Sequence, residues 1–93
     1  MRTIYKYAVK IDASGKCVLT LPKYSTFLHV GQQDGEVFVW TKVNVNTGEE
    51  LEDRILRVYG TGHPMNEVAR QYYLGTAHLY NGALVFHVFE EGE

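Results

Sequence analysis

The chain has a single cysteine, only two prolines and no block of clustered basic residues. One cysteine cannot form an internal disulfide, so the sequence predicts a protein of a reducing cytoplasm with Cys17 as a buried, inert thiol. A net charge of −2 with scattered Lys and Arg argues against a duplex nucleic acid as partner. No apolar run approaches the ~20 residues of a membrane span, and the N-terminus lacks the apolar stretch of a signal peptide. We therefore expect no membrane partner.

Alternation of apolar and polar residues dominates what is present, and this is the period of half-buried β-strands. It predicts strands at 5–11, 17–21, 27–33, 36–45, 51–59, 72–80 and 83–90. The turn signals between them are Asp12–Gly15, Asp34-Gly35, Asn46–Gly48 and Asn81-Gly82, of which the second and fourth favour two-residue hairpins.

The 93 residues are enough for one thin core and therefore one domain. Residues 65–71 alone have helical composition and could form one or two turns after Pro64. Residues 90–93 are expected to form a solvated acidic tail. The sequence thus predicts a single all-β domain of about seven strands, either a compact antiparallel sandwich or an open barrel with at most one short helix.

The last predicted hairpin indicates how the chain could associate. With Asn81-Gly82 at its tip, His78 pairs with Val85 and lies on the same face as His87. That face also carries Phe89 and is too apolar to be left in water. In addition, seven of the twelve aromatic residues of the chain are tyrosines, which suit surfaces shared between subunits. We expect a homo-oligomer, a dimer first of all, with this hairpin at its interface; a sandwich that covers both faces internally is the alternative.

The run from Tyr59 to Pro64, Tyr-Gly-Thr-Gly-His-Pro, is the most specific local pattern in the chain. Its two glycines allow a sharp turn with uncovered N–H groups, which suits a bound anion, although a plain strand-ending turn has the same pattern. It is neither a P-loop nor a dinucleotide-binding fingerprint. Aromatic and basic neighbours extend it to a candidate site for a small nucleotide-like ligand, made of Arg57, Tyr59, Gly60, Thr61, Gly62, His63, Tyr72 and Tyr73.

Metal binding and catalysis find little support in the sequence. The four histidines are scattered and Cys17 has no partner motif, so neither a metal nor another cofactor is expected. No nucleophile stands in a recognisable motif, and we expect no catalytic residues. A small hydrolase with His63 as general base stays open as an alternative.

A pattern that spans nearly the whole chain is carried by the segments Thr3–Tyr7, Leu19–Pro22, Arg57–Pro64, Tyr73–Thr76 and Asn81–Glu90. In this pattern the chain resembles a family of small, mostly uncharacterised bacteriophage and prophage proteins. Small phage proteins without catalytic motifs often inhibit host defence, so the resemblance implies a non-enzymatic binding protein of the host bacterial cytoplasm. Such a protein would sequester a small nucleotide-like signal or mask a host defence protein. A general protein–protein interaction module, or a minor virion or assembly factor, is the alternative.

Overall fold

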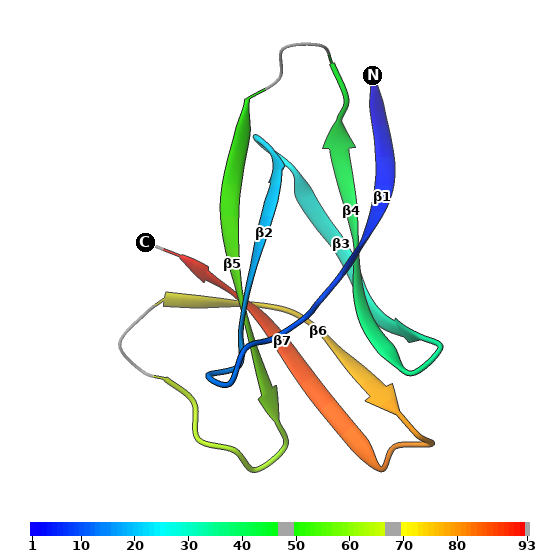
Figure 1. The fold of residues 1–93 in the computed structure, drawn as a ribbon, viewed down its shortest axis with the longest axis vertical. Helices are drawn as coiled ribbons and strands as arrows, with labels where there is room; N and C mark the ends of the chain where they lie inside the picture. The colour runs from blue at the N-terminus through cyan, green and yellow to red at the C-terminus, as the bar shows by residue number, and fades with distance from the viewer. Residues whose placement is uncertain (47–49, 67–69, 93) are drawn as a thin grey trace.

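The computed structural model describes residues 1–46, 50–66 and 70–92, and these ranges contain seven antiparallel strands and no helix (Figure 1). The strands are β1 Arg2–Ala8, β2 Lys16–Pro22, β3 Thr26–Gln33, β4 Glu36–Asn44, β5 Leu51–Gly60, β6 Arg70–Leu79 and β7 Leu84–Gly92. The all-β class predicted from the alternating pattern is confirmed.

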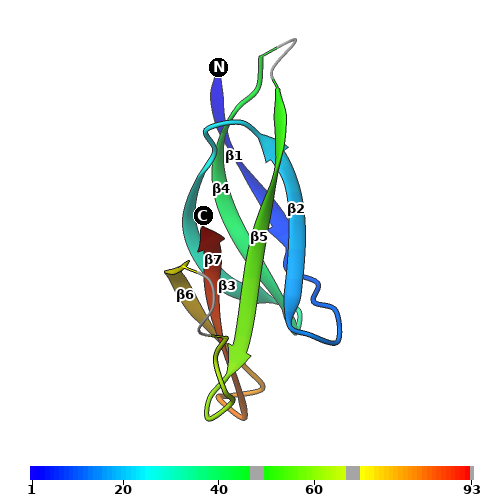
Figure 2. The same ribbon diagram turned by 90° about the vertical axis from the view of Figure 1, so that its left-hand side faces the viewer.

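The strands form two sheets that face each other as an open sandwich (Figure 2). Sheet A has the order β1-β4-β3 and sheet B the order β2-β5-β7-β6. The sheets come closest where β3 meets β6: a Cβ placed on Gly75 would lie 2.8 Å from Cβ of Val30. Gly75 follows a β-bulge in β6, and its missing side chain allows this approach. The result is an elongated molecule of 42 × 32 × 19 Å.

The two strongest hairpin signals behave differently. Asp34 and Gly35 both have positive φ, 52° and 77°, as a two-residue type I′ turn requires, and Gln33 pairs with Glu36. In the last hairpin the predicted register is confirmed, because His78 pairs with Val85. Its loop is wider than predicted: the strands stop at 79 and 84, and positive φ extends over residues 80–82.

Apolar residues from both sheets fill the space between them. The buried core consists of Cys17, Leu21, Val30, Val39, Val43, Leu56, Ala77, Leu79 and Val88. Cys17 is 5% exposed, and burial raises the pKa of its thiol. Both observations agree with the inert thiol predicted from its apolar neighbours.

The segment that could have formed one or two helical turns has none in its described part: Met65 and Asn66 are irregular and Arg70 already begins β6, while 67–69 lie outside the described residues. Another local prediction is wrong. The expected acidic tail is instead part of β7, where Glu90 and Glu91 pair with arginines of the neighbouring strand β5. The arginine partners explain why these carboxylates can lie in a half-buried strand. Glu93 and most of the turn expected at 46–48 lie outside the described residues.

The position of β7 limits how the last hairpin could meet a second copy. Because β7 is hydrogen-bonded on both sides, to β5 and to β6, only its faces and not its backbone could contact another chain. Within the described ranges, no helix is long and apolar enough to cross a membrane.

Candidate binding site

The glycine-rich run forms a tight turn at the end of β5. The N–H of His63 donates to the carbonyl of Gly60 at 3.0 Å, and Gly62 at the third position has a φ of 86°, the pattern of a type II turn. The imidazole of His63 folds back over Gly60, where an added Cβ would lie 2.7 Å from its Cε1 atom. Gly60 therefore permits the ring to lie against the backbone, while Thr61, Gly62 and His63 are exposed.

A groove lies between this turn and the last hairpin. Gly60 pairs with Phe86 across β5 and β7, and this pairing brings the turn beside the start of β7. The hollow has a volume of about 380 Å³ and is lined by Gly60, Thr61, His63, Gly82, Ala83, Leu84, Val85 and Phe86. We call this the turn–hairpin groove.

A chain of four hydrogen-bonded side chains runs across sheet B from the edge of the groove. Thr61 Oγ1 lies 2.8 Å from His87 Nε2, and Thr76 Oγ1 lies 3.0 Å from His87 Nδ1. The hydroxyl of Tyr73 in turn lies 2.6 Å from Thr76 Oγ1. A neutral imidazole donates from one ring nitrogen and accepts at the other, and a hydroxyl can do either. The imidazole of His87 is therefore held in place from both sides.

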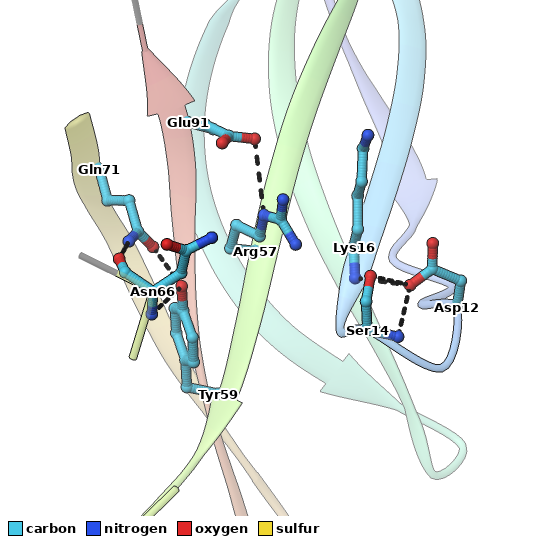
Figure 3. A network of polar contacts seen from close by, with 8 residues as sticks. All are labelled: Asp12, Ser14, Lys16, Arg57, Tyr59, Asn66, Gln71 and Glu91. Atoms are coloured by element: carbon cyan, nitrogen blue, oxygen red, sulfur yellow. Dashed lines mark hydrogen bonds and ion pairs between the residues drawn. The ribbon is translucent and has the colours of Figure 1, made fainter. Parts of the chain in front are cut away.

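Aromatic rings surround this polar chain. Phe89 meets Tyr59 and Tyr73 edge-on, with ring centroids 5.9 and 5.4 Å apart. The hydroxyl of Tyr59 donates to Gln71 Oε1 at 2.6 Å and accepts from the N–H of Asn66 at 3.3 Å, as Figure 3 shows. These bonds attach the segment after the turn to β6.

The structure does not bring all the residues predicted for the site together. Gly60, Thr61 and His63 line the turn–hairpin groove, and Gly62 lies in the same turn. Tyr59 and Tyr73 lie beside it, in the aromatic and polar contacts around Phe89 and His87.

Arg57 and Tyr72 lie away from the groove. Arg57 Nε is 3.5 Å from a carboxylate oxygen of Glu91, and both side chains are less than one-fifth exposed, at 17% and 18% (Figure 3). Tyr72 pairs with Glu90, four residues along β7 from Phe86, which is roughly 13 Å at the usual rise of a strand. Its side chain also points to the opposite sheet face from that of Tyr73, because neighbouring residues of a strand alternate.

Sequence reasoning missed His87 and Thr76 as site residues, although a signal for one contact was present. The hairpin register that pairs His78 with Val85 also places Thr76 opposite His87, as the structure has it. Nothing in the sequence placed Thr61 next to His87, since these residues are separated by 26 positions and meet through the β5–β7 pairing.

The charge of the groove limits what it can bind. Among the described residues, its lining includes no lysine, arginine, aspartate or glutamate. Over residues 1–46, 50–66 and 70–92, no group of three His, Cys, Asp or Glu side chains could hold a metal ion. The groove therefore offers backbone groups, one hydroxyl, one imidazole and an apolar floor.

Fold and site together define a small all-β sandwich with a neutral surface groove at one end of its larger sheet. The chain belongs to the family described as a domain of unknown function (DUF7352), whose model matches residues 1–93. No curated protein and no solved structure matches the chain.

Proposed function

We propose that this protein is a non-enzymatic phage protein that counters host defence by masking a host protein, with the turn–hairpin groove as its contact surface. The observation that carries the proposal is the groove itself, a hollow of about 380 Å³ built from the glycine turn and the last hairpin. Both segments are also among those on which the resemblance to phage proteins rests.

The composition of the groove favours a protein over a nucleotide as its occupant. A nucleotide phosphate is normally neutralised by arginine or lysine, and neither lines the described part of the groove. Arg57, the cation expected to serve the site, faces Glu91 instead. The nucleotide-like signal is therefore the weaker version of the proposal.

An exposed apolar side chain in the groove also suits a protein partner. Leu84 lines the groove and is 44% exposed. Exposed apolar area beside a hollow suits an interaction surface, because a partner side chain can enter the hollow while the rim excludes water.

Affinity purification from phage-infected host cells tests the proposal, with a matched pair of variants. Ala83→Arg places a charge in the groove at an exposed position, whereas Leu51→Arg places the same charge at an exposed position of β5 outside it. The proposal expects one host protein to be retained by the wild type and by Leu51→Arg and lost with Ala83→Arg. Calorimetry against cyclic nucleotides and ADP-ribose derivatives tests the other version, which needs binding at about micromolar or tighter.

A small hydrolase is the second candidate, and one observation favours it. The distance of 2.8 Å between Thr61 Oγ1 and His87 Nε2 lies within the range of a nucleophile and its base, and Thr76 orients the ring. His63, the base expected from the sequence, lines the adjoining groove. Turnover of a chromogenic ester or phosphodiester that disappears in His63→Ala or His87→Gln would support this candidate. Full biological activity in both variants would exclude it.

A further inference from the structure

The outer face of sheet A carries the only tryptophan of the chain. Val39, Thr41 and Val43 of β4 are buried against sheet B, so the residues between them point to the other side. Cross-strand pairing adds neighbours from β1 and β3, because Lys6 and His29 both pair with Trp40. We call this surface the sheet A outer face, and its central residues are Ile4, Lys6, His29, Gly31, Phe38, Trp40 and Lys42.

Three rings gather in the middle of this face. The ring centroid of Trp40 lies 5.6 Å from that of His29 and 6.2 Å from that of Phe38. A Cβ on Gly31 would lie only 3.0 to 3.2 Å from ring atoms of His29 and Trp40, so these rings lie over the backbone at Gly31. Lys6 Nζ stands 4.5 Å from the centroid of the Phe38 ring and also donates to Gln33.

The charge of sheet A has the opposite sign to that of the chain. Its three strands contain the cations Arg2, Lys6 and Lys42 and the single acid Glu36, a balance of +2, whereas the whole chain carries −2. Alternation along β1 and β4 places all three cations on the outer side, together with Glu36 at the start of β4.

A basic hollow continues this face toward the start of β1. It has a volume of about 270 Å³ and is lined by Arg2, Lys23, Tyr24, Thr26, Lys42, Val43 and Asn44. Lys23 also pairs with Glu50 at 3.1 Å. Tyr24 is 86% exposed and its ring centroid lies 5.9 Å from Lys23 Nζ, so it adds an accessible ring at the edge of the hollow.

We propose that the sheet A outer face binds single-stranded nucleic acid. Bases stack on Trp40 and Phe38, and phosphates lie against Lys6, Lys42 and Arg2 and in the basic hollow. Aromatic rings beside a basic groove bind single strands without sequence preference, because every base has a flat face and every linkage a charge. Lys42 and Phe38 are four residues apart on β4, roughly 13 Å, so rings and cations alternate over a short stretch of strand.

This inference goes beyond the masking function and does not depend on it, because the turn–hairpin groove belongs to sheet B. It also agrees with the argument against duplex binding. The bases of a duplex are stacked on one another and cannot stack on protein rings, and three cations are few for a duplex.

Fluorescence of Trp40 tests the proposal directly, since no other tryptophan contributes. The probe is an oligothymidylate of about twelve nucleotides, titrated into the full chain at several salt concentrations. We expect quenching that saturates, and a plot of log K against log salt with a slope of about −2. This slope corresponds to counterions released by Arg2, Lys6 and Lys42, with Lys23 still paired with Glu50. A duplex of equal length is expected to quench far less.

Matched variants separate stacking from charge. Lys6→Gln with Lys42→Gln removes two exposed cations and is expected to bring the salt slope to about −0.7. Trp40→Ala, followed by anisotropy of a labelled oligonucleotide, is expected to weaken binding roughly 5- to 150-fold. The control Lys16→Gln removes one charge from sheet B and leaves binding unchanged.

Several results would overturn the proposal. They are an emission that does not respond to the oligonucleotide, equal binding of the duplex, and equal losses in Lys16→Gln and in the lysine pair. A Trp40 emission that shifts with protein concentration alone would assign the face to contact between two copies instead. If Trp40→Ala does not fold, the lysine pair and its salt slope still decide the question.

Discussion

Thr41 is the residue at which the core departs from apolar packing. Its side chain is fully buried between Val39 and Val43, and among the described residues its hydroxyl has no hydrogen-bond partner. A buried hydroxyl without a partner costs free energy, because its bonds to water are lost on folding. We predict that Thr41→Val raises the free energy of unfolding by about 1 kcal/mol in urea titration. Thr26→Val, on an exposed position of β3, serves as control and is expected to change it by less than about 0.5 kcal/mol. A loss of stability in Thr41→Val would show that the hydroxyl is bonded.

A second prediction for a single residue concerns the stability of a Gly75→Ala variant. The added methyl of Gly75→Ala would meet Val30 at 2.8 Å, and Val30 is itself buried and cannot move freely. We expect a loss of about 1–3 kcal/mol in the same titration. Val30→Ala alone leaves a cavity that the methyl group of Gly75→Ala can partly fill. The loss of unfolding free energy in the double variant should therefore be smaller than the sum of the losses in the two single variants. Strict additivity would mean that β3 and β6 do not touch at this point.

Single residues differ in how far the sequence could place them. The burial of Cys17 followed from the apolar alternation around it, and the pairing of Thr76 with His87 follows from the Asn81-Gly82 register. The Thr61–His87 contact and the pairing of Arg57 with Glu91 did not follow. Both depend on β5 lying next to β7, and strand order is set by packing between distant segments that a local pattern does not record.

At the scale of elements, Arg54 of β5 connects three parts of the chain. Its guanidinium binds both carboxylate oxygens of Glu90 in β7 and donates to the carbonyl of Ser25 at 2.8 Å. It also stands over the ring of Phe27 in β3, 4.7 Å from the centroid. Its hydrogen bonds to Glu90 raise the pKa of Arg54, because they stabilise the charged form of this guanidinium, whose side chain is less than one-fifth exposed.

Arg54→Met therefore tests how the sheets are joined at this end. The variant keeps the apolar stem but leaves Glu90 and the Ser25 carbonyl without their partner in a position less than one-fifth exposed. We predict a loss of about 2–4 kcal/mol in thermal or urea unfolding. Arg2→Met, at an exposed position, is the control and should change little. A loss below about 1 kcal/mol would mean that Glu90 turns to water in the folded protein.

The strands themselves were largely predictable, and the exceptions have physical reasons. Alternation and turn residues gave all seven strands within a few residues of their observed bounds. The helical composition of 65–71 did not indicate that β6 begins at Arg70, because composition alone cannot show that Arg70 and Gln71 pair with the end of β7. The acidic tail failed for a related reason, since Glu90 and Glu91 look solvated until Arg54 and Arg57 are placed beside them.

At the scale of the whole molecule, association of two copies stays a prediction. The edge strands β1 and β2 have one side without a strand partner, whereas the other two edge strands, β3 and β6, lie against each other. The face of sheet B around Phe89 is half-buried and could also contact a second copy. We expect light scattering after size exclusion to give twice the chain mass of 10.6 kDa. A mass near 10.6 kDa at tens of micromolar would contradict this prediction.

The central claim is that the turn–hairpin groove binds a host protein, and photo-cross-linking in infected cells tests it most directly. A photoreactive phenylalanine analogue is placed at Ala83 in the groove, or at Leu51 as an equally exposed control outside it. The account predicts one discrete adduct with a host protein from position 83 and none from position 51. It also predicts that Thr61→Arg, on the opposite wall of the groove, abolishes the adduct. No adduct from position 83, or the same adduct from both positions, would contradict it.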